Sequence, residues 1–152
     1  MFELARELSC FDIPIPELSR TLFEEHRFAY LQLLAEALQN AVLVPEKQFV
    51  WTKVTQTDLE RHDVTFDEVE GLIDVLRRTR EAQVACVLKQ GPDLTGRVLR
   101  RSLGAVDVRL IAERQGGGGH RFAAGFTSDD SAESVVAQIL NALLPDRVPR
   151  MR

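Results

Sequence analysis

Four consecutive glycines at positions 116–119 constrain the fold of this chain more than any other feature. Glycine loses more backbone entropy on ordering than any other residue, so the run is unfavourable in a regular element and predicts a loop. Without Cβ atoms, the main chain can approach a ligand closely and turn several N–H groups toward one anion. Flexible linkers and hairpin tips also contain such runs. Here the apolar segments 106–112 and 123–126 on either side favour a loop embedded in packed structure.

Basic residues gather around this loop. Residues 1–76 contain 15 acidic and 6 basic side chains, whereas residues 77–128 contain 4 acidic and 10 basic ones. The net charge of −4 argues against a general nucleic-acid coat, but a local positive field attracts a small anionic ligand. His120 follows the glycines directly and can donate to a phosphate oxygen or stack on a base. The arginines that lie closest to the loop in sequence are Arg97, Arg100, Arg101, Arg109, Arg114 and Arg121.

The length and composition fit one ordinary globular domain. With 152 residues, of which 45% are apolar and 28% charged, the chain can bury a core, and neither fraction points to a function. No apolar run reaches the length of a membrane span, and the first residues lack the basic region of a signal peptide, which predicts a cytoplasmic protein. Cys10 and Cys86 have no partner at a metal or redox spacing, so we expect buried free thiols.

A long helix is predicted near the start of the chain. Pro16 and Glu17 are typical of a helix N-terminus, because proline is tolerated in the first turn and an acid is favoured by the helix dipole. The apolar face that follows extends to about Asn40. It is wider than a solvent-exposed helix needs, so we expect the helix to pack on more than one partner.

Strands and shorter helices follow. Residues 48–54 alternate as a strand does, and further β-rich segments also predict strands, two of them joined as a hairpin by a turn at residues 91–93. The predicted strands are residues 48–54, 82–89, 95–102 and a short segment after the glycines. The predicted helix starts are the capping pairs Thr57 with Glu60 and Thr65 with Glu68, then Asp107, then residues 129–131. This order predicts an α/β (α+β) fold, in which helices pack on a mixed β-sheet preceded by a long linker helix.

The helix predicted at residues 107–115 points its C-terminal end at the glycine loop, so its dipole does not favour an anion there. Loop N–H groups, His120 and arginines must hold any phosphate instead. Arg101 and Ser102 end the second hairpin strand and can supply a bidentate guanidinium and a hydroxyl at the same place. We interpret Asp107 as the acid that opens the helix, in preference to a catalytic carboxylate.

Several of these segments together resemble a known family. Residues 116–120 and 123–125, with Arg101-Ser102 and residues 106–108 upstream, are similar to the DHH-associated domain of DHH-type phosphoesterases. The bacterial oligoribonuclease and 3'-phosphoadenosine 5'-phosphate phosphatase group, which includes enzymes acting on cyclic di-AMP, resembles the chain most. The resemblance extends over about residues 1–144, and its GGGGH-x-x-AAG string, which contains the GGGH motif, is specific.

The resemblance implies a division of labour. In this family a separate N-terminal domain, named for its Asp-His-His motif, holds two manganese ions and hydrolyses the substrate with a metal-activated water. The associated domain closes over the substrate and binds it. By resemblance, Arg101 and Ser102 face a substrate phosphate. The residues that would line the nucleotide pocket are Gly116, Gly117, Gly118, Gly119 and His120.

The catalytic half of the family is not present in this sequence. There is no Asp-His-His triplet, and His26, His62 and His120 are too scattered for a dinuclear centre, so neither catalytic residues nor metal ligands are predicted here. Manganese is expected in the missing catalytic domain. The predicted domains are residues 1–44, a linker helix and remnant of that domain; residues 45–145, the substrate-binding domain; and residues 146–152, a tail. The chain is either a fragment, which the broad apolar face favours, or a natural stand-alone module.

The resemblance therefore implies the substrate-binding domain of a manganese-dependent phosphoesterase or exoribonuclease, inactive alone. Its expected ligands are short RNA oligonucleotides, cyclic-dinucleotide products or 3'-phosphoadenosine 5'-phosphate, which it would orient toward the metal site of an N-terminal DHH catalytic domain. The alternative is a stand-alone nucleotide-sensing or RNA-binding module, such as the related domain of alanyl-tRNA synthetases, which residues 120–125 disfavour. The sequence leaves open which nucleotide is bound and whether the protein forms a homodimer.

Overall fold

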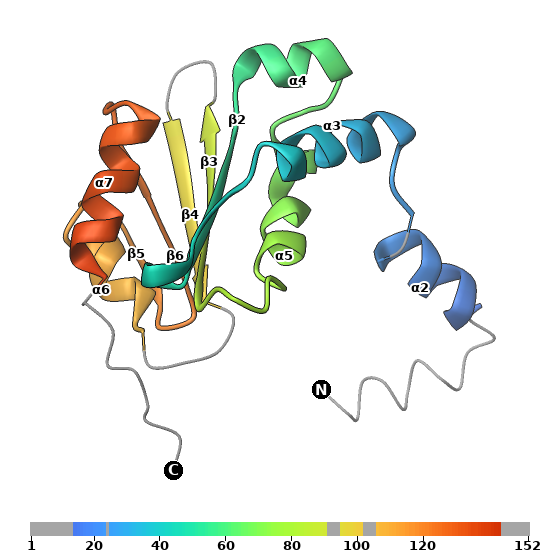
Figure 1. The fold of residues 1–152 in the computed structure, drawn as a ribbon. Coiled ribbons are helices and arrows are strands. Elements are labelled where there is room, and N and C mark those ends of the chain that lie inside the picture. Colours follow the sequence, from blue (N-terminus) through green and yellow to red (C-terminus); the bar gives the residue numbers. More distant parts are fainter. Residues whose placement is uncertain (1–13, 24, 91–94, 102–105, 144–152) are drawn as a thin grey trace.

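The computed structural model describes residues 14–23, 25–90, 95–101 and 106–143. A six-stranded sheet with the strand order β1-β2-β3-β4-β6-β5 lies at its centre, and helices cover both faces (Figure 1). The strands are β1 (Val42–Val44), β2 (Phe49–Val54), β3 (Val84–Gln90), β4 (Thr95–Arg101), β5 (Gly118–His120) and β6 (Ala123–Thr127). The α-helices are α2 (Ile15–Phe23), α3 (Phe28–Gln39), α4 (Gln56–His62), α5 (Leu72–Leu76), α6 (Val108–Glu113) and α7 (Ala132–Ala142). Two 3-10 helices are η1 (Pro45–Lys47) and η2 (Asp67–Gly71).

The sheet is mixed, as predicted. β2 and β3 run parallel, with Phe49 opposite Val84, and the other neighbouring pairs run antiparallel. The segment that joins β2 to β3 contains α4, η2 and α5, which is the kind of helical crossover that parallel neighbours require. The predicted β3–β4 hairpin is also confirmed, with Gln90 opposite Thr95. Its turn lies outside the described residues, and the edge strand β1 was not predicted.

Helices α3, α4 and α5 pack on one face of β2 and β3. Leu33 and Ala37 of α3 are buried there against Val54 of β2 and Ala85 of β3. Thr52 is fully buried in the same layer, where its hydroxyl donates to Ala37 O at 2.5 Å. This bond satisfies a polar group whose burial would otherwise be costly. Helix α3 is therefore part of the core that the sheet forms.

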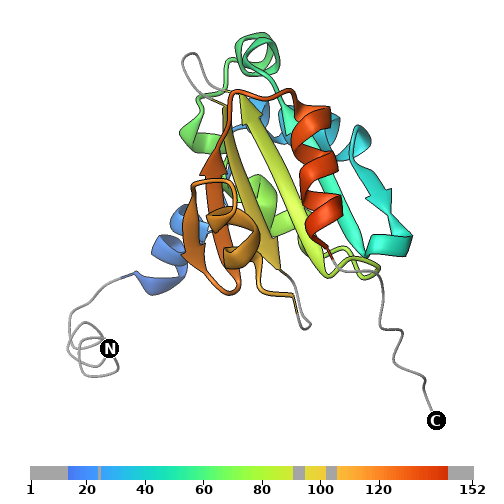
Figure 2. The same cartoon turned by 90° about the vertical axis from the view of Figure 1, so that its left-hand side faces the viewer.

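Helices α6 and α7 cover the opposite face (Figure 2). Their buried side chains are Val108, Ile111 and Ala112 on α6 and Val135, Val136 and Ile139 on α7. They pack against Phe49, Cys86 and Leu88 of the central strands and against Ala124 and Phe126 of β6. Cys86 is a buried free thiol, as predicted, while Cys10 lies outside the described residues.

The long helix predicted from Pro16 to Asn40 is two helices. α2 ends at Phe23 and α3 begins at Phe28, although neither proline nor glycine separates them. Arg27 precedes α3 with an extended ψ of 141°, and its guanidinium donates to Glu68 at 3.2 Å and to Asp63 at 3.1 Å. These partners lie in the segment that follows α4. The helix is thus interrupted where long-range ion pairs hold the chain, a feature that local periodicity cannot reveal.

The cap of α4 lies two residues before the predicted one. Thr55 Oγ1 accepts the N–H of Asp58 at 3.2 Å, and Asp58 Oδ2 accepts the N–H of Thr55 at 2.9 Å, which together form a capping box. Thr57 lies inside the helix. The second predicted pair is present, because the N–H of Thr65 donates to Glu68 Oε2 at 2.8 Å, but it precedes η2, and α5 follows only after that.

The last two helices begin at their predicted caps. Asp107 Oδ1 accepts the N–H of Arg109 at 3.0 Å, and Ser131 Oγ accepts the N–H of Ser134 at 3.1 Å. Each bond satisfies one of the N–H groups that a first helical turn leaves unpaired. Within the described ranges, none of the helices is both long enough and apolar enough to span a membrane.

Candidate anion-binding site at the glycine run

Gly116 ends α6. Its φ of +74° lies in the left-handed region, which glycine adopts without strain. The N–H of Gly116 donates to Glu113 O at 3.1 Å, and the N–H of Gly117 donates to Ala112 O at 2.9 Å. This pair of bonds is a Schellman motif. The first two N–H groups of the run are therefore used inside the chain, so an anion must use groups that follow them.

Gly117 and Gly119 are required by close packing. A Cβ atom on Gly117 would lie 2.2 Å from Gly125 O. Gly119 has a φ of +140°, and a Cβ atom there would lie 2.6 Å from both Ala123 O and Ala124 Cα. Because real Cβ contacts essentially never fall below 3.0 Å, only residues without a side chain fit at these two positions.

Gly118 has no such requirement. It is not among the described glycines with a positive φ, and no heavy atom lies within 4 Å of the place that its Cβ would occupy. A side chain at this half-buried position would meet no neighbour at its first atom. Because glycine has no side chain, open space remains above the backbone, and a ligand can approach the main chain closely there.

The run also contains a strand, whereas a loop was predicted. β5 starts at Gly118 and pairs with β6, with Gly118 opposite Gly125 and His120 opposite Ala123. Pairing with β6 and packing of α6 on both strands offset the entropy that ordering the glycines costs. As the outermost strand, β5 leaves alternate N–H groups unpaired by the sheet. An anion can accept from such groups.

The open space at Gly118 lies on the sheet face that α6 and α7 do not cover. On β6, Ala124 and Phe126 are buried against these helices, so strand alternation turns the residues next to them toward the other face. The partners of those residues on β5 share that face. Among the described residues, the apolar cluster beneath α3, α4 and α5 contains none from β5 or β6. The resulting surface, which we call the glycine floor, consists of Gly118, His120, Ala123 and Gly125.

Two of the predicted arginines have their backbone beside the glycine floor. Arg100 on β4 lies opposite Ala123, which lies opposite His120, so these residues form a row across three strands. Arg101 comes next, at the end of β4, where its backbone lies opposite Val84, a residue of the cluster beneath α6 and α7. Two strand spacings, about 10 Å, separate β4 from β5. Ser102 lies outside the described residues.

The other arginines near the run differ in how they are paired. Arg109 Nη2 lies 3.5 Å from Asp107 Oδ2, and its Nε lies 3.7 Å from Glu113 Oε1, so carboxylates at the two ends of α6 partly neutralise its charge. Arg114 is exposed after α6, and Arg121 is exposed in the turn between β5 and β6. Arg121 is therefore the described arginine side chain that comes closest in sequence to the glycine floor.

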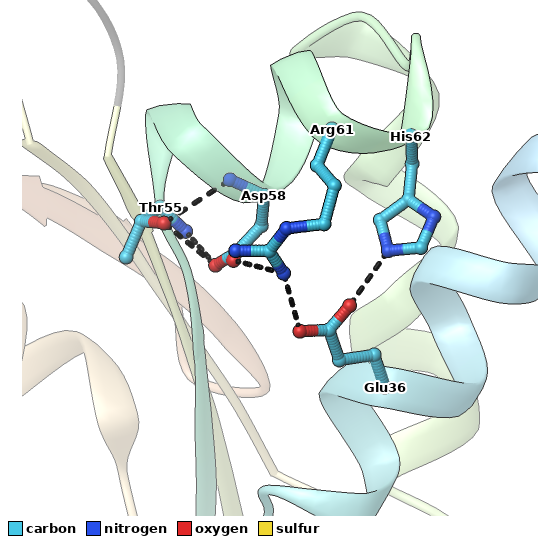
Figure 3. A network of polar contacts seen from close by, with 5 residues as sticks. All are labelled: Glu36, Thr55, Asp58, Arg61 and His62. Atoms are coloured by element: carbon cyan, nitrogen blue, oxygen red, sulfur yellow. Dashed lines mark hydrogen bonds and ion pairs between the residues drawn. The ribbon is translucent and has the colours of Figure 1, made fainter.

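A second polar cluster joins α3 to α4 (Figure 3). Glu36 Oε2 lies 2.6 Å from His62 Nε2, and Glu36 Oε1 accepts from Arg61 Nη1 at 2.7 Å. Arg61 also lies 3.3 Å from Asp58 Oδ1, and Asp58 is held by Thr55 in the cap of α4. The hydrogen bond with His62 is the main cause that lowers the pKa of Glu36. Because the groups pair with one another, the cluster fastens the two helices to each other.

The histidines do not converge on a metal site. Where the structure describes side chains, no group of three or more His, Cys, Asp or Glu residues lies close enough to hold a metal ion. His26 is exposed and lies next to Tyr30, with 4.9 Å between ring centroids, while His62 pairs with Glu36. His120 is exposed on the glycine floor.

A match to a protein family covers most of the chain. The profile of the DHHA1 domain matches residues 46–144, which contain β2 to β6 and the whole glycine run. This chain belongs to the DHHA1 domain family. Strands β2 to β6 and the glycine run thus lie within a DHHA1 domain, the associated domain of the DHH phosphoesterases.

Two solved structures are similar to this DHHA1 domain. An exopolyphosphatase-related protein from Bacteroides fragilis has a TM-score of 0.82 at 20% identity, over 93% of this chain and 42% of that chain. A pGpG-specific phosphodiesterase from Vibrio cholerae, PggH, has a TM-score of 0.56 at 11% identity, over 87% of this chain and 43% of that chain. At these identities the similarity shows a shared fold. The present chain spans less than half the length of either protein.

Two residues of the glycine floor were not predicted as site residues. Ala123 and Gly125 stand out in the sequence only as small residues that follow the run. Their place in the floor depends on strand register, which puts Gly125 opposite Gly118. The sequence contains one indication of this register, namely the small residues on both sides of a two-residue turn. It can be recognised only if residues 118–127 are interpreted as a hairpin.

Proposed function

We propose that this DHHA1 domain binds a phosphate of a short RNA oligonucleotide or adenine nucleotide on the glycine floor. The main support for the proposal is the open space at Gly118. Close packing explains Gly117 and Gly119, and helix termination explains Gly116. Neither reason applies to Gly118. The exposed His120 supplies a hydrogen-bond donor at the edge of the floor. The unpaired N–H groups of an edge strand supply further donors.

The contribution of the domain is binding and orientation. By resemblance to the family, we assign Arg101 and Ser102, at and after the end of β4, to the substrate phosphate, to which a guanidinium and a hydroxyl can donate. A nucleotide held in this way has less freedom to lose when it reaches a catalytic centre. We assign that centre, with its manganese ions and metal-activated water, to an N-terminal DHH catalytic domain in the cytoplasm. Every step that the metal performs belongs to that domain.

We propose three related classes of substrate for this surface. Short oligoribonucleotides, linear products of cyclic dinucleotides and 3'-phosphoadenosine 5'-phosphate all present a terminal phosphate next to a nucleoside. The pGpG-specific phosphodiesterase among the similar structures supports the dinucleotide class. The exopolyphosphatase-related protein supports recognition of phosphate itself.

Calorimetric titration of the 152-residue chain with 5'-phosphorylated diadenylate, without metal, tests the proposal. We expect binding in the micromolar range, and we expect His120→Ala to weaken it about tenfold or more, as loss of a hydrogen bond to a charged group does. We expect Gly118→Ala to weaken it as well, because its methyl group would occupy the open space that the ligand needs. His26→Ala is the matched control, because His26 is also exposed but lies before α3. Absence of binding would contradict the proposal, and so would an affinity for diadenylate that neither floor substitution changes.

Incubation with manganese separates binding from hydrolysis. The chain alone is expected to leave diadenylate intact, and we expect cleavage when a DHH catalytic domain is added. Cleavage by the purified chain alone, in a preparation free of contaminating nucleases, would overturn the assignment of the chemistry to another domain. Tight binding that a DHH domain does not strengthen would favour the alternative, a stand-alone nucleotide-sensing or RNA-binding module.

A further inference from the structure

Lys89 is a charged residue that the fold buries. It lies near the end of β3 and is 7% exposed. Burial of a charge is costly unless the charge is paired or hydrogen-bonded. The other two lysines of the chain have oxygen partners. Lys47 Nζ donates to Leu143 O at 3.2 Å, and Lys53 Nζ lies 3.5 Å from an oxygen of Glu133.

An aromatic ring holds the ammonium group of Lys89. Its Nζ lies over the ring of Phe66, 4.6 Å from the centroid, in a cation–π contact. The contact leaves the three N–H donors of the ammonium unused. Within the described parts of the chain, no oxygen accepts a hydrogen bond from Nζ. Nζ is also not among the described atoms that are sealed from solvent without a partner, so a ligand can reach its donors.

Lys89 lies on the same face of the sheet as the glycine floor. Ala85 and Val87 of β3 belong to the apolar cluster beneath α3, α4 and α5, and strand alternation places Lys89 on that face. Phe66, which holds the ammonium, packs against the same cluster. The glycine floor lies on this face too, because α6 and α7 cover the other one.

A row of three residues leads from Lys89 across the sheet to the edge of the floor. Lys89 lies opposite Gly96 on β4, and Gly96 lies opposite Thr127 on β6. Gly96 has no side chain to separate its two neighbours. Thr127 is exposed and follows the buried Phe126, so it lies on the face of the floor. It is two residues from Gly125, about 7 Å along the strand. We call these three residues the lysine row.

We propose that Lys89 and Thr127 bind a second phosphate of the ligand whose first phosphate lies on the glycine floor, an inference that rests on the proposed function of the floor. An ammonium and a hydroxyl both donate to phosphate oxygens, and bonds between charged groups are the stronger ones. Each ligand class proposed above carries two phosphates joined through a nucleoside. The lysine row therefore makes the site select doubly phosphorylated ligands over nucleoside monophosphates.

Two probes that differ by a single phosphate, 3'-phosphoadenosine 5'-phosphate and adenosine 5'-monophosphate, test this selection by calorimetric titration. Lys89→Met removes the charge and keeps an unbranched side chain at the buried position. We expect it to weaken binding of the doubly phosphorylated probe about tenfold or more, as loss of a hydrogen bond to a charged group does. Its affinity for the monophosphate is expected to stay at the wild-type value.

Three further variants sharpen the test. Lys89→Arg keeps the charge and is expected to bind the doubly phosphorylated probe more tightly than Lys89→Met does. Thr127→Val removes the hydroxyl and is expected to weaken binding of that probe about threefold or more. The matched control is Lys53→Met, the same change at a lysine of β2 that pairs with Glu133 of α7 on the opposite face. Both of its affinities should equal those of the wild type.

The outcomes distinguish this inference from the proposed function. If Lys89→Met binds the doubly phosphorylated probe like the wild type while His120→Ala does not, the lysine row is wrong and the glycine floor stands. Equal losses for both probes in Lys89→Met would also overturn the row. If the wild type binds neither probe, both proposals fail. Circular dichroism shows whether each variant is folded, and the exposed Thr127 provides the test if Lys89→Met does not fold.

Discussion

The four glycines of the run have three kinds of surroundings. One ends a helix, two avoid contacts that no side chain could make, and one faces open space. A substitution therefore has consequences that depend on position within a stretch of identical residues. This difference allows the folding role of the run to be separated from its binding role.

We predict that Gly117→Ala destabilises the protein by about 2 kcal/mol or more, whereas Gly118→Ala changes stability by less than about 0.5 kcal/mol. The Cβ atom at position 117 would overlap Gly125 O at 2.2 Å, a backbone atom that cannot move alone. The Cβ atom at position 118 meets no neighbour within 4 Å. Urea denaturation measures both values. Equal destabilisation by the two changes would contradict the packing argument.

Helices α3 and α4 are fastened to each other by ionisable side chains, so their contact depends on pH. The hydrogen bond with His62 and that with Arg61 lower the pKa of Glu36 from its ordinary value of 4.5. A carboxyl whose pKa is lower in the folded state stabilises the fold above its unfolded pKa. That stabilisation is lost as the pH falls through the folded pKa.

We predict that Glu36→Gln is less stable than the wild type at pH 7 and that the difference shrinks as the pH falls below about 4.5. Urea midpoints measured between pH 7 and pH 3 test this. Glu81→Gln, at an exposed carboxylate before β3, is the control and should follow the wild-type curve. Curves for Glu36→Gln and the wild type that stay parallel over the whole range would refute the prediction.

The start of α4 provides a test of where the cap lies. We predict that Thr55→Ala costs about 1 kcal/mol of stability, because it removes the hydroxyl that accepts the N–H of Asp58 at 3.2 Å. Thr57→Ala, two residues later and exposed, is expected to cost less than about 0.5 kcal/mol. Urea denaturation of the two variants decides between them. A larger loss of stability for Thr57→Ala would support the cap position that the sequence pattern alone predicts.

Elements with local signals were predicted well, and elements that depend on distant partners were not. β2, β3, β4 and α7 have a residue pattern within the element or a cap next to it, as Ser131 illustrates for α7. The interruption before α3 depends on Arg27 and its partners beyond α4. β5 depends on β6 for its order, so a strand that includes Gly118 could not be recognised from glycine propensities. For the same reason the run and His120 were identified as a candidate site, whereas Gly125 needed the register.

The molecule as a whole is organised around a sheet that α3 helps to bury. Leu33 is 1% exposed and Ala37 is 3% exposed, and both belong to the cluster beneath β2 and β3. The predicted domain start at residue 45 would leave this helix out. It remains a prediction, and the burial of α3 suggests how to test it.

We predict that a chain starting at residue 25 melts in one cooperative transition, whereas a chain starting at residue 45 does not. Loss of α3 would uncover the apolar side chains that Leu33 and Ala37 contact, and burial of that surface supplies much of the stability of a domain this small. Differential scanning calorimetry distinguishes a cooperative from a gradual transition. Cooperative melting of the shorter chain would show that residues 45–145 fold as an independent unit.

Both outer strands of the sheet are short, since β1 and β5 span three residues each. Exposed strand edges are templates on which other chains can add strands and grow into aggregates. A three-residue edge offers few backbone hydrogen bonds to an incoming chain, even beside the exposed side chains of Val42 and Leu43. The protein can therefore keep a bare stretch of sheet open to solvent at β5 without nucleating fibrils, and it should remain dispersed at the high concentrations that calorimetry requires.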